Sequence, residues 1–350
     1  MHKTDSEAMH KTATSAGSIR AAALQGFRRM VSNMGAEPDG FLKAVGIDPQ
    51  KLDSPDNRIP YAAMIQLLED CAVQLDCPDF GLRLASYQDI DILGPAAMIA
   101  RYSDTVGASL KSIATYLYVH TTGAVVRVTP VDEELTSISF EVVLPGLHAR
   151  RQINELSIGI GQSMLEMLIA PGFRCQRVQL THRRPRDVKP LIQRFGPRLE
   201  FGHAVNALFL ESTNLKRPVA TANSEFRQIA LGYVRQHLGD AEENRLRRVV
   251  LLVHQFLPTG RCSLHTVSEV LNMHPRTLQR ELARFGEDFR SIVDRVRREL
   301  VADYLANTDA SLTQVADMLG YGDQAAFNNA FRRWYGTSPG EWRKAQVAVG

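Results

Sequence analysis

The stretch Val315-Ala316-Asp317-Met318-Leu319-Gly320-Tyr321 decides how the last third of this 350-residue chain folds. Leu312, Val315 and Leu319 form an i, i+3, i+7 apolar stripe, which predicts a short amphipathic helix. Ser311 stands directly before this helix and has a side chain that commonly caps a helix N-terminus. Gly320-Tyr321-Gly322 then predicts a tight turn, and Asp323 predicts a cap for a following helix. The stretch therefore predicts a helix, a turn and a second helix.

The same pattern occurs a second time, earlier in the chain. Ser263 and Leu264 match Ser311 and Leu312 at an offset of 48 residues, whereas the second helices match at an offset of 49. Pro275, which suits the first turn of a helix, opens the second helix of the first copy. The duplication predicts two helix-turn-helix units, at residues 263–285 and 311–334. The other matched positions are Val267, Leu271, Met273, Leu278, Leu282 and Phe285 with Val315, Leu319, Tyr321, Phe327, Phe331 and Trp334.

The second helix of each unit has apolar residues at i, i+4 and i+7 that would pack on the first helix, and it leaves a polar face outward. Arginine pairs with the O6 and N7 atoms of guanine, and asparagine and glutamine pair with adenine. Arginines near the helix ends suit phosphate contacts. The predicted base readers are Arg276, Thr277, Gln279, Arg280, Gln324, Asn328 and Asn329, and the predicted phosphate contacts are Arg284, Arg332 and Arg333.

An amphipathic helix is predicted between the two units, from Asp288 to about Asn307. Twenty residues of helix span ~30 Å, and successive major-groove faces on one side of B-DNA lie ~34 Å apart. The spacer therefore predicts that the two recognition helices enter consecutive major grooves, with some bending of the DNA. Its predicted buried stripe is Phe289, Ile292, Val293, Val296, Leu300, Tyr304 and Leu305.

Residues 245 to 345 resemble the DNA-binding domain of the AraC/XylS family. The resemblance is carried by residues 315–321, Phe327, the run Ala330-Phe331-Arg332-Arg333-Trp334, Gly336 and Ser338-Pro339. It implies a sequence-specific transcription regulator that binds double-stranded DNA, and more often an activator that contacts RNA polymerase. Asn329 stands where the family most often has arginine. Asparagine would replace a guanine or phosphate contact with an adenine contact. The operator sequences of other family members therefore cannot be assigned to this protein.

Charge and composition are compatible with this interpretation. The net charge is +3, with a net of +4 in residues 245–344 and −1 in the remainder, so the positive excess lies where a polyanion would bind. Hydrophobic residues make up 44% of the chain and charged residues 23%, which is typical of a globular protein. No segment reaches the ~20 apolar residues that span a bilayer, and the N-terminus lacks the apolar core of a signal peptide. We therefore expect a cytoplasmic protein without a membrane partner.

The N-terminal part mixes helical and strand patterns, which predicts an α+β regulatory domain before an all-α domain of two helix-turn-helix units joined by a linker helix. We expect a disordered tail at residues 1–16, a regulatory domain at 17–223, a linker helix at 224–241 and a DNA-binding domain at 242–347. The predicted helices include Pro60–Leu75, Val106–His120, Gln152–Leu168 and Val188–Phe195, and the predicted strands are Ala124–Thr129, Leu135–Val143, Arg174–Leu180 and Ala207–Leu210.

Several stretches of this part resemble the "arabinose-binding-type" regulatory domain of one branch of AraC-type regulators. The resemblance implies a domain for an effector or for dimerisation, and it does not imply arabinose as the ligand. Together with the DNA-binding domain, the resemblance to the family covers roughly residues 20 to 345. The stretches are Asp79-Phe80-Gly81-Leu82-Arg83-Leu84, Gly94-Pro95, Arg151-Gln152 with Glu155, His182-Arg183-Arg184-Pro185, Phe195-Gly196, Phe201-Gly202 and Asn206.

Candidate effector residues are Tyr116, Tyr118 and His120, which alternate by two, and Arg151. The alternating residues could equally edge the core, and Arg151 could form a buried ion pair with Glu155 and Arg83, since Arg151 and Glu155 stand at i, i+4. The position of His182 indicates that it caps the end of a strand rather than binds a ligand. Amino acids, small carboxylates and fatty acids all stay open as effectors. The histidines lie on separate elements and no nucleotide-binding or hydrolase motif occurs, so we expect no metal, no cofactor and no enzyme activity.

Two other classes of function stay open at this point. A DNA-repair methyltransferase can carry the same DNA-binding domain, but it needs a reactive cysteine, and only Cys175, between Arg174 and Arg177, stands beside basic residues. Alternatively, the N-terminal domain of an effector-independent regulator would serve only dimerisation or binding of a partner protein. The favoured mechanism is a homodimer in which an effector changes the relative placement of the two DNA-binding domains.

Overall fold

The computed structural model describes residues 17–144, 147, 149–238, 242–260, 262–271, 273–308 and 310–347. The tail predicted for residues 1–16 lies outside this range. The chain forms two compact units, and the first gives way to the second at Asp240 and Ala241. Each unit is described below by itself.

The first unit is built on a five-stranded sheet with the strand order β3-β4-β7-β5-β6. All neighbours are antiparallel except β5 and β6, which are parallel. The hairpin between β3 and β4 turns at Asp132, whose Oδ1 accepts hydrogen bonds from the backbone N–H groups of Glu134 and Leu135 at 2.8 and 2.7 Å. The strands are β3 (Ala124–Pro130), β4 (Leu135–Val142), β5 (Arg177–Leu180), β6 (Leu199–Phe201) and β7 (Asn206–Glu211), and a separate small sheet pairs β1 (Ser18–Arg20) with β2 (Arg58–Pro60).

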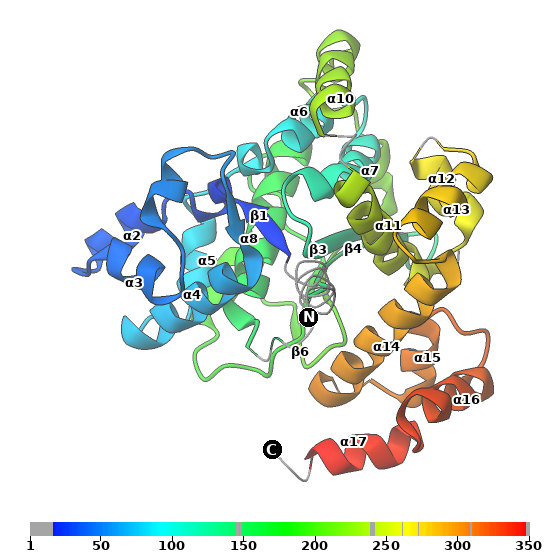
Figure 1. Cartoon of the computed structure of the whole chain (residues 1–350). Coiled ribbons are helices and arrows are strands. Elements are labelled where there is room, and N and C mark those ends of the chain that lie inside the picture. The colour runs from blue at the N-terminus through cyan, green and yellow to red at the C-terminus, as the bar shows by residue number, and fades with distance from the viewer. Residues whose placement is uncertain are drawn as a thin grey trace, which may run out of the picture. The chain divides into compact units, whose positions relative to one another are not determined.

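Helices pack around this sheet, and the longest of them contacts both the sheet and the N-terminal helices (Figure 1). The α-helices are α2 (Phe27–Asn33), α3 (Pro38–Ala44), α4 (Tyr61–Gln74), α5 (Phe80–Ala85), α6 (Pro95–Arg101), α7 (Val106–Tyr116), α8 (Arg151–Ile169), α9 (Lys189–Phe195) and α10 (Ser224–Leu238). Short 3-10 helices are η1 (Ala21–Leu24), η2 (Pro49–Asp53), η3 (Ile90–Leu93), η4 (Leu117–Val119) and η5 (Ser212–Lys216).

Helices α5 and α8 approach each other closely at Gly81. A Cβ atom at this position would lie 2.0 Å from the carbonyl oxygen of Gln152, so only glycine allows this spacing. The Gln152 side chain also joins the two elements, because its Oε1 accepts from the Gly81 N–H at 2.8 Å and its Nε2 donates to the Pro78 carbonyl at 3.0 Å. The first residues of α8 are thereby tied to the N-terminal helices.

The described residues of the second unit after Ala241 form helices and no strand. The predicted fold class, an α+β part followed by an all-α part with two helix-turn-helix units, is therefore confirmed. The elements are α11 (Glu242–Phe256), η6 (Leu257–Thr259), α12 (Leu264–Val270), α13 (Pro275–Arg284), α14 (Phe289–Asn307), α15 (Leu312–Met318), α16 (Gln324–Tyr335) and α17 (Pro339–Val347).

The predicted caps of the second unit are confirmed by their hydrogen bonds. Ser263 Oγ accepts from the Thr266 N–H at 3.1 Å, and Ser311 Oγ accepts from the Gln314 N–H at 3.2 Å. Gln314 Oε1 in turn accepts from the Ser311 N–H at 2.8 Å, which completes a capping box. Asp323 caps α16 in the same way. Local sequence therefore sets where these helices begin.

The core of the second unit contains the predicted apolar positions, with one correction. Leu278, Leu282, Phe327 and Phe331 are buried, as is the inner stripe of α14. Phe285 was expected to pack inward, but its side chain is 39% exposed. Helix α13 ends one residue earlier, at Arg284, so Phe285 lies past the helix end and no longer follows the helical face that contacts α12.

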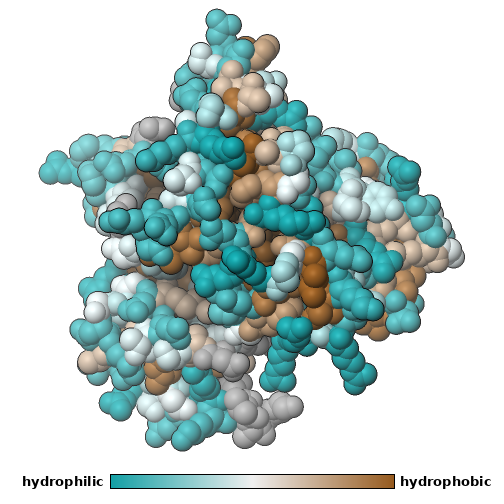
Figure 2. Space-filling model, turned by 180° about the vertical axis from the view of Figure 1, so that it is seen from behind, coloured by the Kyte–Doolittle hydropathy of each residue, from teal (hydrophilic) through white to brown (hydrophobic). Residues whose placement is uncertain are grey.

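Helix α10 packs against α6 in the first unit and has two apolar faces. Ala230, Leu231 and Val234 are buried in a cluster with Ile99 and Val119. Beside this buried face, three large side chains are partly exposed, and the ring of Phe226 lies 5.2 Å from that of Tyr102. In Figure 2 brown and tan residues lie among teal ones at the top of the view, where α10 stands. The exposed fractions are 50% for Phe226, 63% for Ile229 and 50% for Tyr233.

Candidate DNA-binding surface and effector cavity

The exposed face of α13 carries three of the predicted base readers. Arg276, Gln279 and Arg280 are exposed and stand at i, i+3 and i+4, so they share one side of the helix. Thr277 is half-buried beside them. Because Leu278 is buried on the other side, the polar face is held outward. The arrangement can present long donor groups to base edges, while the N–H groups of the first helical turn favour a phosphate oxygen.

The corresponding face of α16 is less uniform. Asn329 is exposed, whereas Gln324 and Asn328 are half-buried. Gln324 Oε1 already accepts a hydrogen bond from Thr313 Oγ1 of α15 at 2.9 Å. Asn328 Oδ1 is buried and has no hydrogen-bond partner among the residues that the structure describes. Asn329 is therefore the polar side chain of α16 that is most accessible to a base.

The three predicted phosphate contacts lie at the helix ends, as their positions in the sequence require. Arg284 is exposed in the last turn of α13, and Arg332 and Arg333 are exposed in the last turn of α16. Arg333 Nη2 lies 3.7 Å from Asp294 Oδ2 of α14, a contact that leaves most of its side chain exposed. All three guanidinium groups can reach an anionic ligand from the surface.

Arg297 of α14 is a residue whose importance the sequence reasoning missed. Its Nε donates to the Leu319 carbonyl at 3.0 Å and its Nη2 to the Gly320 carbonyl at 3.1 Å, while the guanidinium lies 4.4 Å from the centre of the Tyr321 ring. Gly320 has a φ of +66°, and a Cβ atom there would lie 2.5 Å from the Leu257 carbonyl oxygen. The turn of the second unit is therefore held from two sides, which explains why a glycine and an aromatic residue follow one another.

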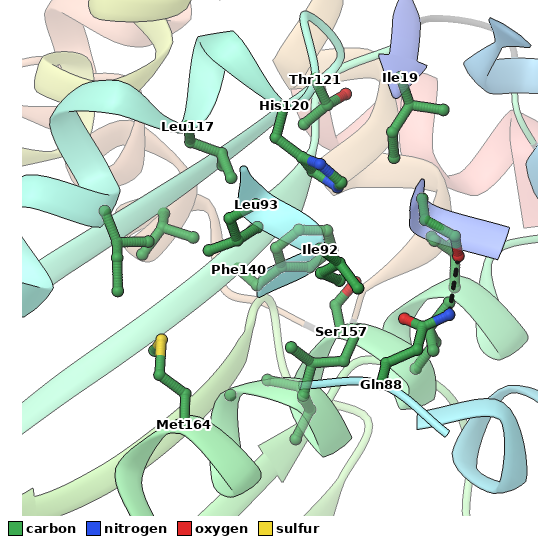
Figure 3. Close-up of a pocket in the computed structure, with 18 of the residues that line it drawn as sticks. Ile19, Gln88, Ile92, Leu93, Leu117, His120, Thr121, Phe140, Ser157 and Met164 are labelled. Carbon is green, nitrogen blue, oxygen red and sulfur yellow. Dashed lines mark hydrogen bonds between the residues drawn. The ribbon is translucent and has the colours of Figure 1, made fainter. Parts of the chain in front are cut away.

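A cavity of about 100 Å³ lies in the first unit, between the sheet and α8. Register places Val126 opposite Phe140 and Ile138 opposite Leu208, so one face of the sheet forms its apolar wall. The remaining walls come from β1, η1, α4, η3, α7, η4 and α8, and Figure 3 shows several of them. Among the residues that the structure describes, the lining contains no aspartate, glutamate, lysine or arginine. Its polar side chains are Tyr61, Gln88, His120, Thr121, Ser139 and Ser157.

His120 is the one predicted effector residue that lines this cavity, and its ring points into it (Figure 3). Burial, together with the nearby charges of Arg20 and Arg58, lowers the pKa of His120 to about 3. The ring hydrogen-bonds the Ile92 backbone, and Nδ1 has no partner within the described part of the chain. A neutral imidazole that donates through Nε2 leaves Nδ1 as an acceptor.

The other predicted pocket residues lie elsewhere. Tyr116 and Tyr118 pack against the cluster formed by α6 and α10, and they are not among the residues that line the cavity. The reason is that the chain passes from α7 into η4, in which each residue advances by a third of a turn. His120 then points away from the two tyrosines, whereas Leu117 and His120, three apart, share a side and both line the cavity.

Arg151 belongs to a separate ionic cluster at the start of α8. Its Nε lies 2.7 Å from Glu155 Oε1, and Glu155 is fully buried, so the predicted pair is confirmed. Arg83 was expected to join this pair, but it instead pairs with Asp79 at 3.0 Å on its own helix. His182 Nε2 lies 3.3 Å from Glu155 Oε1. Burial raises the pKa of Glu155, against the opposing effect of Arg151, and burial also lowers the pKa of His182.

Cys175 does not have the environment that a reactive cysteine needs. It is buried, and burial raises the pKa of its thiol to about 12. The thiolate, which is the nucleophile, is therefore scarce at neutral pH. This geometry argues against the DNA-repair interpretation.

Two helix-turn-helix units with exposed recognition helices define the class of helix-turn-helix DNA-binding proteins. Residues 35–219 match the family described as the arabinose-binding domain of AraC transcription regulators, and residues 267–345 match a helix-turn-helix domain. The chain belongs to the AraC family, and it is a DNA-binding transcription regulator. Within the described part of the chain, no helix is long and apolar enough to cross a membrane.

Similar proteins are found along almost the whole chain. The HTH-type transcriptional regulator VirS of Mycobacterium tuberculosis is 35% identical over 326 residues, which cover 93% of this chain and 96% of that protein. The ornithine utilization regulator of Pseudomonas aeruginosa is 25% identical and covers 90% of this chain and 93% of its own. The crystal structure of the transcriptional regulator CdpR from Pseudomonas aeruginosa covers 87% of this chain and 96% of its own, with 23% identity and a TM-score of 0.44.

Proposed function

We propose that this regulator binds DNA through both recognition helices of one monomer, with α13 and α16 in consecutive major grooves. The observation that carries the proposal is the pair of outward polar helix faces joined by the single helix α14. Its 19 residues correspond to ~28 Å of helix, a little less than the ~34 Å between successive grooves. Modest bending of the DNA toward the protein would make up the difference.

Within this arrangement the two groups of side chains have different roles. Arg276, Gln279 and Arg280 of α13 would contact bases, with Thr277 beside them, and Asn329 would do so from α16, supported by Gln324 and Asn328. Arg284, Arg332 and Arg333 would contact phosphates and contribute equally to every DNA sequence. Asn329 at the exposed centre of α16 favours adenine in the second half-site.

We propose that the regulator activates transcription and contacts RNA polymerase, as the family resemblance implies. Since its target is chromosomal DNA, we place it in the cytoplasm. A footprint on sites recovered by genome-wide mapping tests the binding mode. Protection of two successive major grooves on one face of the DNA by one monomer is the expected result. Protection of a single groove, with α16 variants that bind normally, would rule the two-groove arrangement out.

The first unit is proposed to sense a small molecule in the cavity that contains His120. Support comes from the apolar lining, which is typical of ligand sites, and from a buried ring nitrogen without a partner among the described residues. Ligand binding would shift the population between two placements of the DNA-binding units in a homodimer.

The dimer contact is proposed to form through α10 with a second copy of the chain. Exposed aromatic and aliphatic residues at i, i+3 and i+7 are the pattern of a helix that pairs with another helix. The helix also leads directly into the DNA-binding unit along the chain, so pairing there would bring two such units together. Ile229→Asp should make the protein monomeric in sedimentation analysis, whereas Val73→Asp, at an exposed position of α4, should not.

The same apolar face favours a second function, in which the first unit only dimerises or binds a partner protein and no effector exists. A thermal-shift screen with amino acids, fatty acids, aromatic acids and neutral aromatic compounds separates the two functions. A ligand that raises the unfolding temperature and alters DNA binding supports sensing. If no compound acts, while Ile229→Asp abolishes regulation, the effector-independent function is favoured.

A further inference from the structure

The cavity of the first unit lacks the charge that a carboxylate ligand needs. No lysine or arginine of the described part of the chain lines it. The nearest cations are already engaged, since Arg20 pairs with Asp56 at 2.7 Å and donates to the Ile92 carbonyl at 2.6 Å. Arg58 donates to the backbone carbonyls of Val119 and His120 at 2.6 and 2.8 Å. An ionised carboxylate would lose its hydration inside the cavity without an opposite charge, which disfavours amino acids and fatty acids.

Two buried acceptor atoms in the lining have no hydrogen-bond partner among the described residues. One is Nδ1 of His120, in the neutral form established above. The other is Oε1 of Gln88, whose Nε2 donates to the carbonyls of Ala23 and Gln25 at 2.9 and 3.0 Å and thereby fixes the amide. Figure 3 shows the His120 ring at one wall and the Gln88 oxygen turned toward Ser157. Buried acceptors without partners are costly, so both atoms favour a ligand that donates.

The size of the cavity limits the ligand to a small molecule. Its volume of about 100 Å³ compares with the ~150 Å³ of an engineered apolar cavity that holds benzene. Met64 and Met164 are in the lining, and methionine side chains adapt to the shape of a ligand. A single aromatic ring with few substituents therefore matches the space.

We infer that the cavity binds an uncharged, largely apolar molecule of about one aromatic ring that carries one or two hydroxyl or N–H donors, and that each donor uses one of two acceptors, His120 Nδ1 or Gln88 Oε1. This inference rests on the proposed sensing function of the same cavity and names the ligand chemistry. Phenol is the simplest molecule with these properties. Toluene has the same shape without the donor, and benzoate adds a charge.

Calorimetric titration and thermal shift of the full-length protein with these three probes test the inference. Phenol should bind and raise the unfolding temperature, and benzoate should not. His120→Phe keeps an aromatic ring at this position, with a somewhat larger ring, and removes the acceptor. It should weaken phenol binding by about three- to tenfold, the equivalent of one hydrogen bond, and should leave toluene binding unchanged. Met167→Leu, at an exposed position on α8 outside the lining, is the matched control and should change neither phenol binding nor toluene binding.

Several results would overturn the inference. Benzoate binding more tightly than phenol, equal losses of phenol and toluene binding in His120→Phe, or no binding of any probe would each contradict the ligand chemistry. Ser157→Leu should fill the cavity and abolish binding, and Ser157→Val is a smaller change should the first variant fail to fold. If folded Ser157 variants leave promoter regulation in cells unchanged, the sensing function itself fails. If they alter regulation while no probe binds, only the ligand chemistry is wrong.

Discussion

Acidification should destabilise the first unit through His120, by an amount that the structure allows to be worked out. The pKa of His120 falls from 6.5 to about 3 on folding because the ring is buried near Arg20 and Arg58. Below about pH 6.5 the unfolded chain binds a proton that the folded chain cannot bind until about pH 3. The contribution to stability is therefore fully present above that range and is lost as the pH falls through it.

The expected loss between about pH 7.5 and about pH 5 is roughly 2 kcal/mol, from the linkage between proton binding and folding. The perturbation is His120→Phe, which removes the titrating group. The free energy of unfolding of the wild type should fall by about 2 kcal/mol more than that of the variant over this range. His182, whose pKa is also lowered, and Glu155, whose pKa is raised, are present in both proteins, so their effects cancel in the difference.

Urea unfolding followed by far-ultraviolet circular dichroism measures this difference. The chain has two tryptophans, Trp334 and Trp342, both in the DNA-binding unit, so tryptophan fluorescence follows that unit separately. With a slope of ~2 kcal/mol per molar urea, the difference corresponds to a midpoint shift of about 1 M. Parallel pH profiles of wild type and His120→Phe would refute the reasoning, since they would mean that the folded protein protonates this ring as easily as the unfolded chain.

Three further predictions concern the DNA-binding surface and the packing. Arg280→Ala should cost ~1–3 kcal/mol of specific binding and relax one base preference. Arg332→Ala should weaken binding to every sequence and reduce the slope of log affinity against log salt concentration by ~0.9. If the two variants behave identically in a salt titration, the division into base-reading and phosphate-contacting arginines is wrong. Gly81→Ala should destabilise the first unit by ~1–3 kcal/mol because its Cβ would meet the backbone of α8, while Gly232→Ala on α10, where nothing lies within 4 Å, should stabilise by ~0.5–1 kcal/mol. Arg297→Met should cost ~1–3 kcal/mol in the second unit, measured by tryptophan fluorescence, and an unchanged unfolding midpoint would show that its bonds to the turn contribute nothing.

The second unit could be predicted from sequence in unusual detail because its signals are local. A cap such as Ser311 and the stripe that follows it act within a few residues, and the duplication supplies the same pattern twice. The predicted strands at 124–129 and 135–143 are likewise confirmed, and they pair with each other in the structure, since alternating residues are a local signal. The prediction that Phe285 packs inward was wrong because α13 ends one residue earlier, at Arg284. Periodicity does not specify the exact residue at which a helix ends.

The candidate cavity could be predicted only in part. Its lining comes from β1, η1, α4, the segment before η3, η3, α7, η4, α8 and the sheet. These elements are far apart along the chain, so no periodicity connects Gln88 with Ser157. Spacing by two suggested that Tyr116, Tyr118 and His120 point together. The 3-10 turn of η4 instead directs His120 away from the two tyrosines. Arg83 and Arg151 each have one acidic residue four positions away, Asp79 and Glu155, and each arginine pairs with that local partner.

Residue type and spacing along the chain are enough to predict the two helix-turn-helix units, the side chains of their recognition helices and the length of the helix between them. These features depend on signals within single helices. The packing of distant segments was needed to show that His120 and Gln88 line one uncharged cavity, that Arg297 holds the turn of the second unit, and that α10 keeps apolar side chains exposed. Burial and the absence of a hydrogen-bond partner among the described residues are properties of the surroundings of a side chain, and those surroundings are assembled from distant parts of the chain.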